Sequence, residues 1–200
     1  EPSVASLSDG GFVVTWWSYQ QDGYYDVYGQ RYDANGESVG EEFRANVDRT
    51  SYDQEKPSVA GLENGEFVVT WQDETTSSRS SQLDHIPSSE LDNSGWAVFG
   101  QKFKTVDANG DPIDTPVPVA DESQFQANTW TSSTQANPSV TGLDDGGYIV
   151  TWHSYDQDVG NDDYGVYGQR YDAAGAKEGD EFQINTTTSG HQYYPSVTVL

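Results

Sequence analysis

The chain has 200 residues, of which 34% are apolar and 13% aromatic, and its 33 acidic and 9 basic residues give a net charge of −24. This charge is the opposite of the Lys- and Arg-rich surface that nucleic acids or anionic membranes require. The sequence contains no Cys and no apolar run long enough to cross a bilayer, so we expect neither disulfides, thiolate metal sites nor membrane insertion. Aromatic and β-branched residues without a helical apolar period predict an all-β fold.

Several landmarks recur in the same order along the chain. A PSV-type segment starts at Pro2, Pro57, Pro138 and Pro195. After the first three of these comes a turn and an apolar run of the FVVTW type, which ends at Trp16, Trp71 and Trp152. A Gly-Gln pair follows, with its glutamine at Gln30, Gln101 and Gln169. Self-similarity at this spacing indicates one structural unit copied along the chain.

Each unit of about 55 residues is predicted to form four antiparallel strands. The Asp-Gly-Gly or Asn-Gly-Glu turn joins the first two strands, because Gly and Asn tolerate a positive φ. The FVVTW run is apolar at nearly every position, which indicates a strand covered on both faces. The predicted units span residues 1–56, residues 57–137 with loop insertions, and residues 138–194, and residues 195–200 form the first strand of a next unit.

A sheet of four strands repeated in this way is typical of a β-propeller blade. We therefore expect propeller-like blades, with a linear β-sandwich or solenoid array as the alternative. The repeated Trp and Gln then have structural roles, the Gln as a buried amide that ties neighbouring backbones together. The Gly before each Gln is expected to let a facing aromatic ring or a backbone segment approach closely.

The combination of PSV-x-x-L, DGGFVVTW, VYGQRYDANG and GEEF resembles tandem repeats of very large secreted bacterial proteins of the RTX-like and adhesin kind. The resemblance covers residues 2–72 and 138–200. It implies an extracellular or cell-surface location, neighbouring repeats of the same or an adjacent chain as partners, and Ca²⁺ in at least part of the parent protein. It implies no defined catalytic activity.

Candidate ligand-binding residues lie in the loops between the second and third strands of the units. The densest group of carboxylates is a possible Ca²⁺ site, because Ca²⁺ prefers oxygen ligands; it consists of Asp156, Asp158, Asp162 and Asp163. Aromatic rings beside acidic residues are typical of a sugar site, and the candidates are Tyr24, Tyr25, Tyr155 and Tyr164. Packing between blades is the alternative explanation for these rings. His153 takes the place of Trp17 and Gln72, which suggests a surface position.

The sequence offers no unique catalytic constellation such as GxSxG, a P-loop or HExxH. The leading prediction is therefore an extracellular structural or adhesive repeat module that is not an enzyme. One alternative is a lectin-like module that binds surface polysaccharide. A second alternative is a glycosidase-related propeller, which would need a pair of carboxyl groups converging on one pocket.

Overall fold

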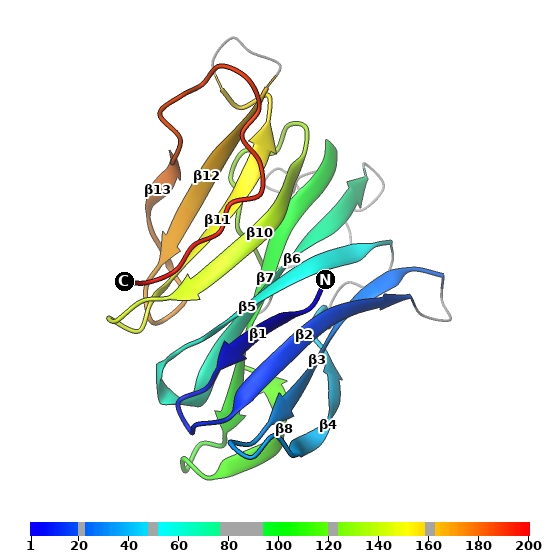
Figure 1. Ribbon diagram of the computed structural model, residues 1–200, viewed down its shortest axis with the longest axis vertical. Helices are drawn as coiled ribbons and strands as arrows, with labels where there is room; N and C mark the ends of the chain where they lie inside the picture. Colours follow the sequence, from blue (N-terminus) through cyan, green and yellow to red (C-terminus); the bar gives the residue numbers. More distant parts are fainter. Residues whose placement is uncertain (20–22, 48–51, 77–93, 120–123, 159–162) are drawn as a thin grey trace.

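A computed structural model describes the chain except for residues 20–22, 48–51, 77–93, 120–123 and 159–162. Its fold is all-β, as predicted: three antiparallel sheets lie side by side in chain order (Figure 1). The described ranges contain no α-helix, only the short 3₁₀ turn η1 (Glu63–Gly65). No helix within these ranges is therefore long and apolar enough to span a membrane.

The three sheets follow one another along the chain, and the second and third begin at Gln54 and Gln135, before the predicted starts of their units. The first sheet runs in the order β1 (Ser3–Ser6), β2 (Phe12–Tyr19), β3 (Tyr25–Tyr32), β4 (Ser38–Arg44). The second runs β5 (Gln54–Gly61), β6 (Glu66–Thr76), β7 (Ser94–Val106), β8 (Pro112–Pro118), and the short β9 (Phe125–Gln126) also pairs with β7. The third runs β10 (Gln135–Gly142), β11 (Tyr148–Tyr155), β12 (Tyr164–Tyr171), β13 (Lys177–Gln183).

The first strands of the three sheets, β1, β5 and β10, are called here the inner strands, because β5 contacts both β1 and β10. The last residues of the chain, 195–200, run beside β10 in red in Figure 1, without being assigned as a strand. The Val197 amide donates to Oγ of Ser139 at 3.2 Å. The same bond joins Val140 to Ser58 at 3.1 Å, so this tail lies in the position of a further inner strand.

Two hydrophobic cores fill the spaces between neighbouring sheets. In the core between the first and second sheets, Phe43 packs on the stacked pair Phe67 and Phe103, whose ring centroids are 5.3 Å apart. In the core between the second and third sheets, Phe125 packs in the same way on Tyr148 and Tyr171, which are 4.7 Å apart. The same interface is therefore built twice.

The apolar second strand explains this arrangement. Residues of β6 point alternately to its two faces, so Val69 and Trp71 enter one core while Val68 enters the other. The prediction of a strand covered on both faces is correct for β6. Trp71 and Trp152 are fully buried at equivalent positions, whereas Trp16 is only half-buried, because none of the three sheets in the described ranges covers that face of β2.

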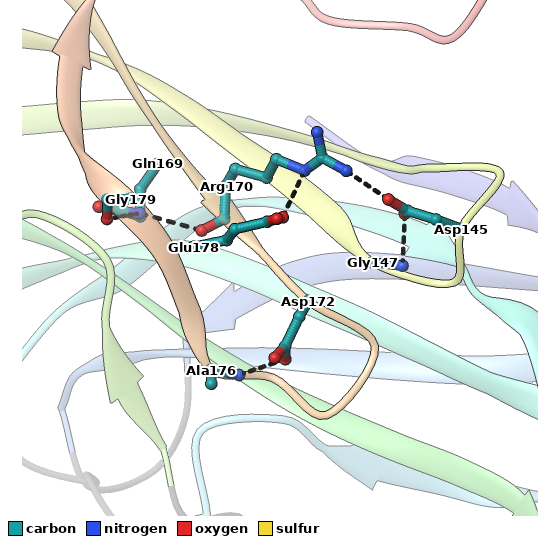
Figure 2. A network of polar contacts seen from close by, with 8 residues as sticks. All are labelled: Asp145, Gly147, Gln169, Arg170, Asp172, Ala176, Glu178 and Gly179. Atoms are coloured by element: carbon teal, nitrogen blue, oxygen red, sulfur yellow. Dashed lines mark hydrogen bonds and ion pairs between the residues drawn. The ribbon is translucent and has the colours of Figure 1, made fainter.

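The repeated glutamine ties backbones together as expected. The pairing of β12 with β13 shifts register between Gly168 and Arg170, and this bulge frees backbone carbonyls at that point. Figure 2 shows the buried Gln169 side chain filling the bulge, with Nε2 donating to the carbonyl oxygens of Arg170 at 2.9 Å and Gly179 at 3.1 Å. Gln30 and Gln101 donate in the same way to the carbonyls of the residues that follow them.

The repeated glycine also has its expected role. A Cβ atom at Gly29 would lie 2.5 Å from Cζ of Phe43, and one at Gly100 would lie 2.6 Å from Cζ of Phe125. Real side-chain atoms do not approach this closely. The absence of a side chain therefore allows each phenylalanine to lie flat on the third strand and reach the next sheet.

Candidate functional site

A backbone bulge surrounds the proline of two of the inner strands, β5 and β10. The register of β5 against β6 shifts between Glu55 and Ser58, and that of β10 against β11 shifts between Ala136 and Ser139. Inside these bulges Lys56 has φ 51° and Asn137 has φ 55°. Tyr194, before Pro195, also has φ 55°. This left-handed conformation is uncommon for residues other than Gly, and bulges often serve to re-aim a side chain.

The re-aimed side chains gather at one end of the inner strands. Glu1, Lys56, Asn137 and Tyr194 each stand directly before a proline of the repeat, and together with Trp17 they line a cavity of about 430 Å³. We call this cavity the mouth. Its volume lies in the range of small-molecule sites, and it combines two aromatic rings with an acid, a base and an amide. At the other end, the inner strands line a separate groove of about 650 Å³.

A chain of hydrogen bonds fixes the floor of the mouth. Lys56 Nζ donates to Oδ1 of Asn137 at 2.8 Å, which links the second sheet to the third. The backbone amide of Asn137 donates to Oε1 of Gln72 at 3.2 Å, and Gln72 Nε2 donates to Oε2 of Glu55 at 3.3 Å. The polar groups are thus held in place by the fold before any ligand arrives.

Two titratable groups beside the mouth have shifted pKa values. Burial, and then the nearby charge of Asp53, raise the pKa of the Glu55 carboxyl above its usual value. Burial, and then the positive charge of Lys56, lower the pKa of His153 from 6.5 to about 4. The imidazole is therefore neutral at neutral pH. It is also buried, which corrects the prediction of a surface position for His153.

Lys56 is a cation with no carboxylate partner among the residues that the structure describes. Other basic residues of the chain do have one: Arg31 pairs with Asp9, and Lys102 pairs with Glu66 at 3.1 Å. The ammonium group of Lys56 instead donates to Oδ1 of Asn137 and lies 5.8 Å from the centroid of the Tyr194 ring. Lys56 can therefore donate hydrogen bonds to a ligand in the mouth.

The four tyrosines predicted for sugar binding fall into three separate groups. Tyr155 and Tyr164 lie together on the third sheet, with ring centroids 4.8 Å apart, and Tyr164 also meets His153 edge to face at 5.0 Å. On the first sheet, Tyr25 meets Trp17 edge to face at 4.5 Å, so it supports a ring that lines the mouth. Tyr24 instead lies beside Tyr52 at 5.6 Å.

The predicted Ca²⁺ ligands lie in the sequence between the end of β11 at Tyr155 and the start of β12 at Tyr164. Asp158 accepts hydrogen bonds from the hydroxyl of Tyr167 and from Gln183 Nε2, the latter at 2.8 Å, whereas Asp163 accepts one from the Gly190 amide at 3.0 Å. Asp156 is exposed, and Asp162 lies outside the described residues. Within the described ranges no three His, Asp or Glu side chains gather to hold a metal ion. Calcium binding stays a prediction.

One feature of the sequence indicates the residues of the mouth, although the candidate sites were sought in the loops between the second and third strands. The PSV segment is nearly constant, but the residue before its proline is different in every copy: Glu1, Lys56, Asn137 and Tyr194. A variable position inside a constant motif is where ligand contacts are expected on a repeated scaffold. Trp17 carries the same signal, since His153 and Gln72 replace it in the other units.

No protein-family model matches the chain, and no curated protein matches it. Solved structures do share its fold. A thermostable family-43 glycoside hydrolase is similar at a TM-score of 0.51 and 11% identity, over 99% of this chain and 60% of that one. An endo-arabinase from Bacteroides thetaiotaomicron VPI-5482 has a TM-score of 0.46 and 12% identity, over 92% of this chain and 61% of that one. A xylan β-1,4-xylosidase from Bacillus halodurans C-125 has a TM-score of 0.46 and 15% identity, over 94% and 32%.

The chain thus spans about three fifths of the length of the first two structures and a third of the last. At 11% identity the first likeness shows the fold. It contradicts the prediction that the chain is not an enzyme, because the matching fold is that of a glycoside hydrolase. The comparison agrees better with the glycosidase-related alternative than with an adhesive module. The RTX-like resemblance and the extracellular location stay predictions.

Proposed function

We propose that the chain is part of a glycosidase-related propeller, that its three sheets are blades, and that it holds a polysaccharide at the mouth. The observation that carries the proposal is the convergence of Trp17, Lys56, Asn137 and Tyr194 on one cavity of about 430 Å³. Sugar rings present apolar faces that stack on aromatic side chains and hydroxyls that hydrogen-bond to charged and amide groups. The mouth offers aromatic rings for stacking and charged and amide groups for hydrogen bonding, and these side chains come from three different sheets.

The proposal includes a hydrolytic role. Cleavage of a glycosidic bond needs two carboxyl groups beside the scissile bond, one of them protonated. The raised pKa of Glu55 favours its protonated form, which is what a general acid needs. Glu1 lines the mouth and supplies a second carboxyl group. We therefore propose Glu55 as the acid and Glu1 as its partner.

Binding is tested with arabinan, xylan and one acidic polysaccharide in affinity electrophoresis. Loss of one stacking ring should cost about 0.5 to 1.5 kcal/mol. Trp17→Ala and Tyr194→Ala should therefore each weaken binding about two- to tenfold. Trp130→Ala is the matched control, because Trp130 is 39% exposed but lines a different cavity. Equal losses in all three variants, or no retardation by any polysaccharide, would refute a site at the mouth.

Hydrolysis is tested separately by the release of reducing ends from the polysaccharide that binds best. Glu55→Gln should abolish release while leaving the electrophoretic retardation unchanged. A Glu55→Gln protein as active as the parent would remove Glu55 from its proposed role. Retardation by the parent chain without any release of reducing ends would leave a lectin-like module and refute the hydrolytic part.

A further inference from the structure

The two outermost sheet faces of this chain are the two halves of its own internal interface. Between neighbouring sheets, one side contributes a projecting Phe and the other a stacked aromatic pair: Phe43 on Phe67–Phe103, and Phe125 on Tyr148–Tyr171. The first sheet uses only its projecting half and the third sheet only its receiving half. Each therefore leaves the other half uncovered by the residues that the structure describes.

The uncovered half on the third sheet is the projecting one. Phe182 stands at the position of Phe43 and Phe125, and Ile184 stands at that of Ala45 and Ala127. The backbone confirms this equivalence, because Ile184 donates to the carbonyl of Val166 at 2.8 Å as Ala127 does to that of Val98 at 2.8 Å. Phe182 and Ile184 are both 43% exposed, whereas Ala127 is fully buried. With Leu143, Ile149 and Val166 they form what we call the projecting face.

The uncovered half on the first sheet is the receiving one. Phe12 and Tyr32 are stacked with ring centroids 5.0 Å apart, like Phe67–Phe103, but no third ring packs on them within the described residues. Trp16 is half-buried where Trp71 and Trp152 are fully buried. Val4 is 65% exposed, although its equivalents Val59 and Val140 are almost fully buried. What we call the receiving face consists of Phe12, Val14, Trp16, Tyr28 and Tyr32.

We propose that the projecting face docks on the receiving face of a second copy of this chain, head to tail. A second copy is the expected partner because the same kind of interface already occurs twice within the chain. Phe182 of one copy would pack on Phe12 and Tyr32 of the next, as Phe43 packs on Phe67 and Phe103. The contact joins two different faces, so it repeats from copy to copy. Such assembly closes into a ring where the rotation allows and otherwise continues as a filament.

The tail at residues 195–200 determines how the copies join. It already lies beside β10 as an inner strand, in the position that β1 of the arriving copy would need. Its sequence PSVTVL resembles PSVASL of the β1 segment. We infer that β2 of the arriving copy pairs with this tail and releases its own β1. The two copies then share one sheet.

The oligomeric mass of the whole chain tests the proposal by sedimentation equilibrium. The parent chain should give multiples of 22.0 kDa. Moderate salt should be present, because self-repulsion at a charge of −24 opposes association. Phe182→Asp removes the projecting face, and Trp16→Asp removes the receiving face. Val117→Asp is the control, because Val117 is an apolar residue 40% exposed on β8, away from both faces, and this change adds the same charge.

Each single-face variant should be a 22.0 kDa monomer on its own, while Val117→Asp behaves as the parent. An equal mixture of Phe182→Asp and Trp16→Asp should give one capped dimer, because each variant supplies the face that the other lacks. A monomeric parent would overturn the proposal. So would a mixture that stays monomeric, since head-to-tail docking requires the two intact faces to join.

Hydrogen exchange of the assembled parent tests the strand substitution. Amides of the tail at Ser196 and Thr198 should gain protection relative to the monomeric variants, because these amides alternate with that of Val197, which already donates to Ser139. Amides of β1 should lose protection. Assembly with unchanged protection of β1 would refute the release of β1. Intact circular dichroism and urea unfolding of both single-face variants would show that they lose association and not the fold.

Discussion

Asn128 and Gln135 join the end of the second sheet to the start of the third, with Asn128 Nδ2 donating to Oε1 of Gln135 at 3.1 Å. Oδ1 of the same Asn128 accepts the amide of Val98 at 2.9 Å. Asn46 with Gln54 and Asn185 with Gln192 repeat this pairing at 2.9 and 3.0 Å. One Asn–Gln clasp therefore fixes each connection between units.

Asn128→Ala should lower the free energy of unfolding by about 2 to 3 kcal/mol, because it leaves buried polar groups of Val98 and Gln135 without this partner. Asn185→Ala is the matched control. Its clasp is only partly buried, so water can replace the lost bonds and the loss should stay below about 1 kcal/mol. Urea unfolding measures both, and equal losses would contradict the importance of burial.

Gly100→Ala should destabilise the chain by about 1 to 3 kcal/mol, since the new methyl group would overlap Phe125 and force the ring out of the second core. Gly168→Ala is the control at the equivalent position. There the nearest atoms, of Ile184 and Phe182, are 3.2 and 3.3 Å away and belong to an exposed face where side chains can move. A thermal melt that shifts equally in both variants would show that the Gly–Phe contact is unimportant.

His153 should make stability depend on pH below neutrality. Its pKa is about 4 in the folded chain and near 6.5 when unfolded, so the unfolded chain takes up the proton first. The stabilisation is complete above pH 6.5 and is lost progressively as the pH falls to about 4. His153→Gln, which copies Gln72 of the second sheet, should remove this part of the pH dependence. A difference between the two unfolding curves that does not vary with pH would contradict the shift.

Lys56→Asn should raise the pKa of His153, because the positive charge of Lys56 is one of the two causes that lower this pKa, the other being burial. Asn already adopts the required backbone conformation at Asn137, where φ is 55°. Nuclear magnetic resonance titration of the imidazole measures the change. An unchanged or lower value would mean that Lys56 does not act on the ring.

Two neighbours on β12 should differ sharply in their contribution to stability. Gln169→Leu should cost about 1 to 3 kcal/mol, because the backbone carbonyls of Arg170 and Gly179 lose the donor that the fully buried Gln169 side chain supplies. Arg170→Ala removes the ion pairs with Asp145 and Glu178 in Figure 2, but these side chains are 42 to 56% exposed. Exposed pairs contribute about 0 to 1 kcal/mol. A larger loss in Arg170→Ala, measured by urea unfolding, would reverse this assignment.

The repeat was enough to predict the sheets, because each copy contains the strands of one sheet in sequence. Landmarks such as Trp71 and Gln101 mark positions within a strand, and such local structure can be predicted from the pattern of residues along the chain. The mouth was harder to predict because its residues come from four copies and become neighbours only once the inner strands lie side by side. The burial of His153 depends on Tyr193 and Tyr194, about forty residues further along the chain, which ring the imidazole at 5.5 and 5.7 Å.

A left-handed residue stands before Pro57, Pro138 and Pro195 and takes no part in either core. Its backbone conformation is fixed by the bulge, while its side chain contributes nothing to either core, so Lys56, Asn137 and Tyr194 share one geometry with three chemistries. Substituting these positions together, with residues that tolerate a φ near 55°, would change the chemistry of the mouth and leave the side chains of both cores unaltered.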